Sequence, residues 1–476
     1  MNKFASKILL STLALSLAGG GIALACENGQ KSYIEAGEST FGGIPKVEGS
    51  KNFEHLKEVA AVPLKDIKGK PATTADVYAY KGYAYLGTHR GQMTNEGVRI
   101  FDMKDPANPK EVAVLANDIP GTWQEKVIVQ SVSTPSFKGD LAAVSVQRVD
   151  KERYGYEGET SENGGVVLYD VTNPKEPKKL GFWKTPSNLP TGTHEHWLTE
   201  QNNKVLLLAT NYQAHRYKDK GVDVHDFSIV DVTNPRKSEE LSNWDPTEVG
   251  GSFNGDYQYE DETGAQRTAF LHSVITDETG KYAYLSYWDL GTIILNIEDP
   301  ANPKFVGRTK FERDVQGAAH SAALAHGGNI LIETREIFNP DPHDPGFERG
   351  WGYVRVYDIK DKSNPVLLST FRTLNSMVQI KAGERKPGTY TVHDPKVRGN
   401  TLYLSHYSDG IRMVDLTDPA NPVEVGSYVS DKANVWGVFV DRNYILASDM
   451  GQGLKVLQKK ADLNVNKMNL QSFLIK

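Results

Sequence analysis

The chain has 476 residues, a formal net charge of -6, 9% aromatic residues and one cysteine. This length suffices for one large domain or two ordinary ones. The mild acidity argues against a nucleic-acid partner, because phosphate binding needs a basic face, and one cysteine excludes an intramolecular disulfide.

The first 25 residues are typical of a secretory signal. Lys3 and Lys7 precede an apolar run from Ile8 to Leu17, and small residues end the segment at Ala25. A basic region, an apolar region and a small-residue cleavage site follow one another in signal peptides. The apolar run is too short to span a bilayer as a mature helix. We therefore expect an exported protein, located in the periplasm, at the cell surface or outside the cell.

Cys26 directly follows the expected cleavage site, and two interpretations stay open. In the first, Cys26 carries a lipid as the N-terminus of a bacterial lipoprotein. In the second, the protein is freely secreted, since Ala23 and Leu24 are atypical of a lipoprotein signal. We expect contact with a membrane only through that lipid. Residues 26–55 are then a tether, residues 56–460 the folded domain and residues 461–476 a C-terminal tail.

One strand pattern recurs along the domain at a period of roughly 40 to 75 residues, which indicates a repeat architecture. β-branched and aromatic residues dominate it, as strands prefer. An Asn-Pro or Asp-Pro turn follows most copies, as in 105–109, 299–303 and 418–422. The copies are 98–102, 166–170, 227–231, 293–296, 354–358, 411–415 and 454–457.

Each copy lies within a unit of four antiparallel strands, and seven units predict an all-β, seven-bladed β-propeller. The segment 57–62 (Lys-Glu-Val-Ala-Ala-Val) closely echoes 110–115, the fourth strand of the first unit. We therefore expect this N-terminal strand to complete the last blade, which removes a free sheet edge.

The strand Phe227-Ser-Ile-Val-Asp231 and its copies resemble the LVIVD-repeat family of exported bacterial proteins. The resemblance covers nearly all of the chain after the signal and implies a propeller. It implies no particular reaction, because the family is defined by its blades.

Long insertions all fall on one expected face of the propeller, in 149–164, 211–226, 244–267, 336–352 and 372–390. Long loops in a compact domain often carry function. The alternative interpretation is loop growth without function.

Histidines recur where the innermost strand of four consecutive units enters the central channel. They are His194 or His196, His272, His320 and His393. His194 and His196 lie two residues apart and should point to the same side of a strand. The other units place Asp76, Gln130 or Ser131, and Trp436 at this position.

Converging imidazoles predict a transition-metal site for copper, zinc, manganese or iron. Glu195, Glu333 and Asp394 are the candidate acids that orient ligands or move protons. Arg148 and Arg335 are candidates for holding an anionic substrate. The competing interpretation is that the histidines are structural and hold the blades together. His215, His225, His326 and His343 are expected to be surface residues.

Two functions from different classes remain. One is a metal-dependent enzyme, redox, hydrolytic or lyase, that acts on a small anionic molecule. The other is a non-catalytic surface protein that binds a protein, glycan or envelope component through its long-loop face. The sequence has no Gly-rich phosphate loop, serine elbow, His-Glu-x-x-His or paired-cysteine motif, which argues against nucleotide use and serine or cysteine catalysis. We expect a monomer.

Overall fold

The computed structural model describes residues 54–66, 69, 71–89, 96–149, 163–189, 191–211, 214, 221, 225–249, 252–253, 258–260, 264, 266–311, 317–338, 351–377 and 388–459. The predicted signal peptide and C-terminal tail, Cys26 and nearly all of the tether lie outside these residues. So do most residues of the long insertions, together with His215 and His343. In the part that is described, no helix is long and apolar enough to cross a bilayer.

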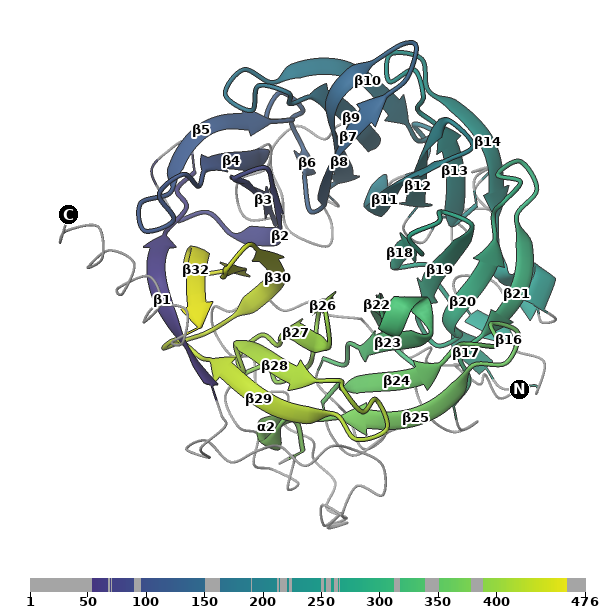
Figure 1. The fold of residues 1–476 in the computed structure, drawn as a ribbon. Helices are drawn as coiled ribbons and strands as arrows, with labels where there is room; N and C mark the ends of the chain where they lie inside the picture. The colour runs from purple at the N-terminus through teal and green to yellow at the C-terminus, as the bar shows by residue number, and fades with distance from the viewer. Residues whose placement is uncertain are drawn as a thin grey trace, which may run out of the picture.

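Antiparallel sheets stand side by side around a common axis, which gives an all-β, propeller-like fold (Figure 1). The strands nearest the axis are β2 (Thr74–Tyr80), β7 (Val127–Ser133), β11 (Thr193–Gln201), β18 (Ser273–Thr276), β22 (Ala319–Ala325), β26 (Pro395–Arg398) and β30 (Val435–Asp441). The next strands outward are β3 (Tyr83–Thr88), β8 (Lys138–Arg148), β12 (Lys204–Asn211), β19 (Tyr282–Tyr287), β23 (Ile330–Arg335), β27 (Thr401–Ser405) and β31 (Tyr444–Asp449).

The third strands carry the recurring motif found in the sequence. They are β4 (Val98–Asp102), β9 (Gly165–Asp170), β13 (Phe227–Asp231), β20 (Gly291–Asn296), β24 (Val354–Asp358), β28 (Ile411–Asp415) and β32 (Gly453–Lys459). The outer strands are β5 (Lys110–Leu115), β10 (Lys178–Lys184), β14 (Glu239–Trp244), β21 (Lys304–Arg308), β25 (Val366–Phe371), β29 (Val423–Tyr428) and β1 (Glu54–Val62).

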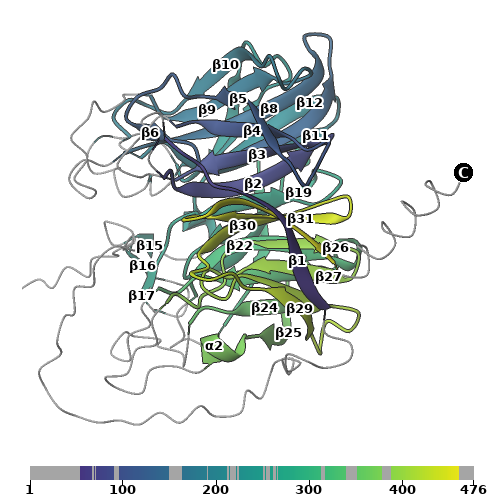
Figure 2. The same cartoon turned by 90° about the vertical axis from the view of Figure 1, so that its left-hand side faces the viewer.

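Short elements complete the fold. The two-residue strand β6 (Thr122–Trp123) pairs with β8, and a three-stranded sheet of β15 (Ser252–Phe253), β16 (Gln258–Glu260) and β17 (Gln266–Thr268) follows β14. Figure 2 shows β6 and this small sheet on the same side of the ring of sheets. The helical turns are η2 (Pro246–Val249), η3 (His326–Gly328) and α2 (Leu374–Met377).

The N-terminal strand β1 closes the ring, as the sequence predicted. It pairs antiparallel with β32 from Leu56 to Val62 and parallel with β29 at Glu54 and His55. β1 therefore lies between β29 and β32, and it joins the last strands of the chain into one eight-stranded sheet. Two sheet edges are covered by this one strand.

The aspartate that ends most of the third strands caps the turn that follows. Asp102 Oδ1 accepts a hydrogen bond from the backbone N–H of Lys104 at 3.0 Å, and Asp415 Oδ1 accepts one from Thr417 at 2.8 Å. This side-chain turn is the reason that the repeat favours Asp or Asn at this position. The core lies between neighbouring sheets. For example, Leu206 and Phe227 pack with Leu285 and Ile293 of the next sheet.

Candidate functional site

A recurring hydrogen bond fixes the residues at the axial end of the innermost strands. A serine or threonine hydroxyl of the second strand accepts a hydrogen bond from the backbone N–H of one residue near the start of the innermost strand. Within the described residues this bond occurs from Lys126 to Ser145, Glu195 to Thr210, Ser321 to Thr334, Asp394 to Ser405 and Gly437 to Ser448, at 2.8–3.2 Å.

Several of the same hydroxyls donate to the next sheet. They bond the carbonyls of His272, His393 and Trp436 at 2.6–3.2 Å. The register also shifts at this point in β11, β22 and β30. Such bulges turn a side chain out of the regular strand alternation. The residue before each bonded N–H is thereby aimed at the axis.

Seven aromatic side chains meet around the axis, and we call them the axial ring. Successive ring centroids lie 3.8–5.9 Å apart, and none of the seven side chains is more than 7% exposed. In order they are His194, His272, His320, His393, Trp436, His89 and Trp123. The structure thus brings together four of the five histidines predicted as ligands.

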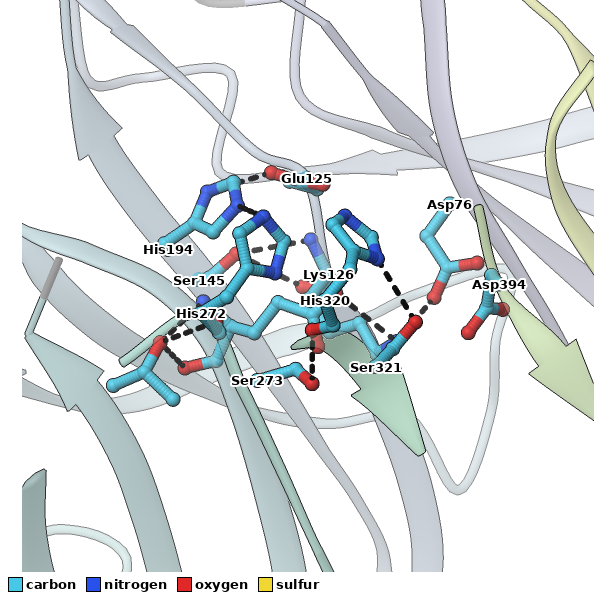
Figure 3. Close-up of polar contacts among 12 residues, drawn as sticks. Asp76, Glu125, Lys126, Ser145, His194, His272, Ser273, His320, Ser321 and Asp394 are labelled. Carbon is cyan, nitrogen blue, oxygen red and sulfur yellow. Dashed lines mark hydrogen bonds and ion pairs between the residues drawn. The ribbon is translucent and has the colours of Figure 1, made fainter. Parts of the chain in front are cut away.

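The nitrogens of neighbouring imidazoles face one another. His194 Nε2 lies 2.9 Å from His272 Nε2 (Figure 3). Two imidazole nitrogens that each lie about 2.0–2.1 Å from one tetrahedral ion are separated by about 3.3–3.4 Å. The two nitrogens of this pair are hydrogen-bonded at a slightly shorter distance, so a small outward movement of the rings would let both bind a single ion.

Glu336, one residue beyond β23, brings a carboxyl group close to the imidazoles of the axial ring. Ligand atoms of His272, His320 and Glu336 all lie within 4.8 Å of one another. Glu336 Oε2 is 3.5 Å from His320 Nε2, and Oε1 is 3.8 Å from His393 Nε2. The hydroxyl of Tyr407 donates to Glu336 Oε1 at 2.5 Å, which holds the carboxyl group in place.

Burial keeps three of the ring imidazoles neutral. It lowers the pKa of His272, His320 and His393 well below the usual range, and the charge of another ring histidine lowers each pKa further. A neutral imidazole has the lone pair that a metal ion needs. Burial also raises the pKa of Glu336 to about 8. Such a carboxyl holds a proton near neutral pH, and a cation beside it would favour the ionised form.

His196 does not join the axial ring. It is fully buried, and its Nε2 donates to the carbonyl of Ala143 at 3.0 Å. Burial lowers its pKa to about 3. The register shift between Thr193 and His196 separates it from His194, so the regular alternation assumed for this pair does not apply. His196 joins the third sheet to the second.

Four charged side chains gather near the ring, and we call them the axial charged layer: Asp76, Lys126, Glu195 and Asp394. Lys126 Nζ lies 2.8 Å from Asp76 Oδ2 and 3.7 Å from Glu195 Oε1. Burial raises the pKa of Glu195 to about 7 and that of Asp394 above its usual value. The two predicted acids thus lie beside the axial ring, where Glu195 contacts the ammonium group of Lys126 and Asp394 pairs with Lys396.

Glu333 lies away from the axial ring. Its Oε2 accepts hydrogen bonds from Thr292 and Thr309 at 2.6–2.9 Å, and its Oε1 is 3.3 Å from Arg355 Nη1. The side chain is fully buried. These contacts give Glu333 a structural role that joins two sheets, rather than the catalytic role considered from the sequence.

The two predicted substrate arginines also serve the fold. Arg148 donates to the backbone carbonyls of Pro186, Ser187 and Leu189. Arg335 is fully buried, donates from Nε to the carbonyl of Gly317 at 3.0 Å and stacks on Tyr353. Because loop carbonyls and an aromatic ring engage these guanidinium groups, we do not assign substrate binding to them.

Sequence reasoning missed several residues of the site. In the second sheet it placed Gln130 or Ser131 at the axis, whereas Glu125 and Lys126 stand there. The reason is that β8 is longer than expected and pairs Val144 with Val127, so the axial position lies before β7. The short strand β6 gave no sequence signal. Glu336 had one, since it directly follows Arg335 at the end of a second strand.

Of the histidines expected at the surface, two are described. His326 Nε2 donates to the carbonyl of Leu416 at 2.7 Å, and His225 Nδ1 lies 2.7 Å from Asp245 Oδ2. Both are partly buried, and neither belongs to the axial ring.

A family model described as LVIVD repeat matches residues 279–310 and 391–430. The chain contains LVIVD repeats. The matched segments span β19–β21 and β26–β29, so the resemblance seen in the strand motif is confirmed there. A comparison with curated protein sequences finds no match.

Two solved structures are similar in fold at low identity. The β-propeller domain of Cps50 (Swd1) from Myceliophteria thermophila has a TM-score of 0.50 and 11% identity, with 85% of this chain and 99% of that domain covered. Raptor from Chaetomium thermophilum has a TM-score of 0.51 and 10% identity, with 86% of this chain and 29% of Raptor covered. At such identity these likenesses show the propeller-like fold alone.

Proposed function

We propose that this chain is an exported, seven-bladed propeller whose axial ring binds one transition-metal ion for redox, hydrolytic or lyase chemistry on a small molecule. One observation carries the proposal: the buried imidazoles of His272 and His320 converge with the carboxyl group of Glu336, and His194 Nε2 lies 2.9 Å from His272 Nε2.

The blade count rests on how the sheets are divided. The eight-stranded sheet counts as two blades, because β1 contacts β29 through only two residue pairs but β32 through most of its length. With the other sheets that contain four or more strands, this makes seven.

The donor set favours a metal of intermediate softness. Imidazole nitrogen with one carboxylate suits zinc, copper, iron or manganese. Such an ion, when bound, supplies Lewis-acid or redox chemistry. The chain's own part is to hold the imidazoles neutral, to fix Glu336 through Tyr407, and to place the ammonium group of Lys126 nearby. With Arg148 and Arg335 engaged elsewhere, Lys126 is the cation best placed to favour a negatively charged ligand.

Export is proposed from the N-terminal sequence alone. The basic, apolar and small-residue order of residues 1–25 supports it, and Cys26 leaves both lipid attachment and free secretion open. Metal loading would then occur at, or on the way to, the final compartment.

The decisive experiment is metal analysis of protein purified without a histidine tag. We expect about one equivalent of a transition metal, retained through desalting and lost in a His272→Ala/His320→Ala double variant. The His326→Ala variant is the matched control, since His326 lies outside the axial ring, and should keep the metal. A folded, metal-free protein that takes up no added ion would refute metal binding and favour the second function, a non-catalytic binding propeller.

A further inference from the structure

Glu125 occupies the axial position of the second sheet, where four other sheets have a histidine. The next residue, Lys126, donates its backbone N–H to Ser145, just as Glu195, which follows His194, donates to Thr210. Glu125 is fully buried. The sequence therefore replaces an imidazole by a carboxyl group at one point of a repeated pattern.

The carboxyl group of Glu125 contacts the back of an imidazole. Its Oε2 lies 2.8 Å from His194 Nδ1, and its Oε1 accepts the indole N–H of Trp436 at 3.2 Å. Gln147 Oε1 also lies 2.7 Å from His194 Nδ1. Figure 3 shows Glu125 and His272 at different nitrogens of the His194 ring.

These contacts determine which nitrogen of His194 carries the proton. The amide oxygen of Gln147 only accepts hydrogen bonds, so Nδ1 must donate to it, and Glu125 Oε2 lies beside the same nitrogen. In the neutral ring the other nitrogen, Nε2, then presents its lone pair, and it does so toward His272 Nε2 at the axis. Carboxylates behind ligand histidines act in this way in metal sites.

We propose that Glu125 is a positioning residue that, together with Gln147, holds His194 in the Nδ1–H tautomer and aims its Nε2 at the ion. This rests in part on the metal site proposed above. Glu336 has the opposite geometry, since it faces Nε2 of His320 and of His393. Glu336 therefore lies beside the nitrogens proposed to bind the ion, whereas Glu125 lies beside the other nitrogen of His194.

The burial of Glu125 supports a dedicated role. Removing a polar group from water is costly unless it has a partner. Among the described residues, Glu125 contacts His194 Nδ1 through Oε2 and the indole N–H of Trp436 through Oε1. If Glu125 served only to accept the hydrogen bond of Trp436, a neutral acceptor such as an amide would be enough.

The first test needs no metal. In metal-free protein labelled with ¹⁵N-histidine, NMR should show His194 with its proton on Nδ1. A proton on Nε2 would overturn the inference.

The second test is titration with Co²⁺ alone, followed by its visible spectrum. Glu125→Gln should bind Co²⁺ about 10–100-fold more weakly than the unchanged protein and shift the Co²⁺ bands. Glu333→Gln is the control: it also removes a buried carboxylate but lies away from His194, so it should lower stability and leave Co²⁺ affinity unchanged.

The outcomes separate the two proposals. Equal Co²⁺ affinity in Glu125→Gln and the unchanged protein would overturn the role of Glu125 while leaving the metal site standing. No Co²⁺ binding by the unchanged protein, with His194 still protonated on Nδ1, would refute the metal site and support the tautomer assignment.

Discussion

The buried pair of Lys126 and Asp76 gives the sharpest test of the axial architecture. The two charged atoms lie 2.8 Å apart, and the side chains are only 7% and 6% exposed. Burial acts to lower the pKa of Lys126, but Asp76, Glu195 and Asp394 outweigh it and hold the pKa well above the usual value. Lys126 is therefore an ammonium group inside the protein, and its removal leaves the buried Asp76 without its ion-pair partner.

The Lys126→Met variant should lose about 3–5 kcal/mol of stability, as is typical when one partner of a buried pair is removed. A fold of about 400 residues has an unfolding entropy of about 0.8 kcal/mol per K, at about 2.1 cal/mol per K for each residue. The loss therefore corresponds to a fall in Tm of about 4–6 °C, which calorimetry or a fluorescence melt resolves.

Lys204→Met is the matched control. Lys204 Nζ lies 3.0 Å from Asp231 Oδ2, but its side chain is 45% exposed. An exposed pair contributes about 0–1 kcal/mol, so Tm should change by about 1 °C or less. The reasoning is refuted if the two variants melt alike, or if adding Asp76→Asn to Lys126→Met recovers none of the loss.

Three further predictions concern other parts of the fold. Burial lowers the pKa of His406 to about 4, so between about pH 6.5 and 4 the unfolded protein binds a proton that the folded protein does not bind. Stability therefore decreases by about 1.4 kcal/mol for each unit by which the pH is lowered in this range. His406→Gln should show a smaller loss of Tm from pH 7 to pH 5. Leu56→Ala in β1 removes a buried side chain that packs on the last sheet and should cost about 2–5 kcal/mol, whereas Lys57→Ala, an exposed neighbour, should be neutral in the same melt. A Cβ at Gly87 would lie 2.1 Å from the carbonyl oxygen of Glu125, so Gly87→Ala must displace Glu125 and should weaken Co²⁺ binding in titrations; unchanged affinity would contradict the role given to this segment.

The sequence predicted the fold well because the repeat is local chemistry. β-branched strands, side-chain turn caps such as Asp102, and the echo of the fourth strand in residues 57–62 each specify structure within a few residues. The resemblance of the inner strands also placed His272, His320 and His393 at the axis.

The rest of the site depends on details that one sequence does not reveal. A register shift in β11 sends His194 and His196 to different neighbours. The longer pairing of β8 moves the axial position of the second sheet to Glu125 and Lys126. Arg148 and Arg335 look like ligand-binding residues until their carbonyl and aromatic partners are known. In each case a tertiary contact, and not residue type, decides the role.

The most direct test of the metal centre is a crystal structure of the protein loaded with Co²⁺ or Zn²⁺, with anomalous data collected at the metal edge. The account predicts one strong peak about 2.0–2.1 Å from Nε2 of His194 and of His272, with His320 and Glu336 completing the ligand set. A ring in which His194 and His272 remain bonded to each other, with the ion absent or bound elsewhere, would contradict it.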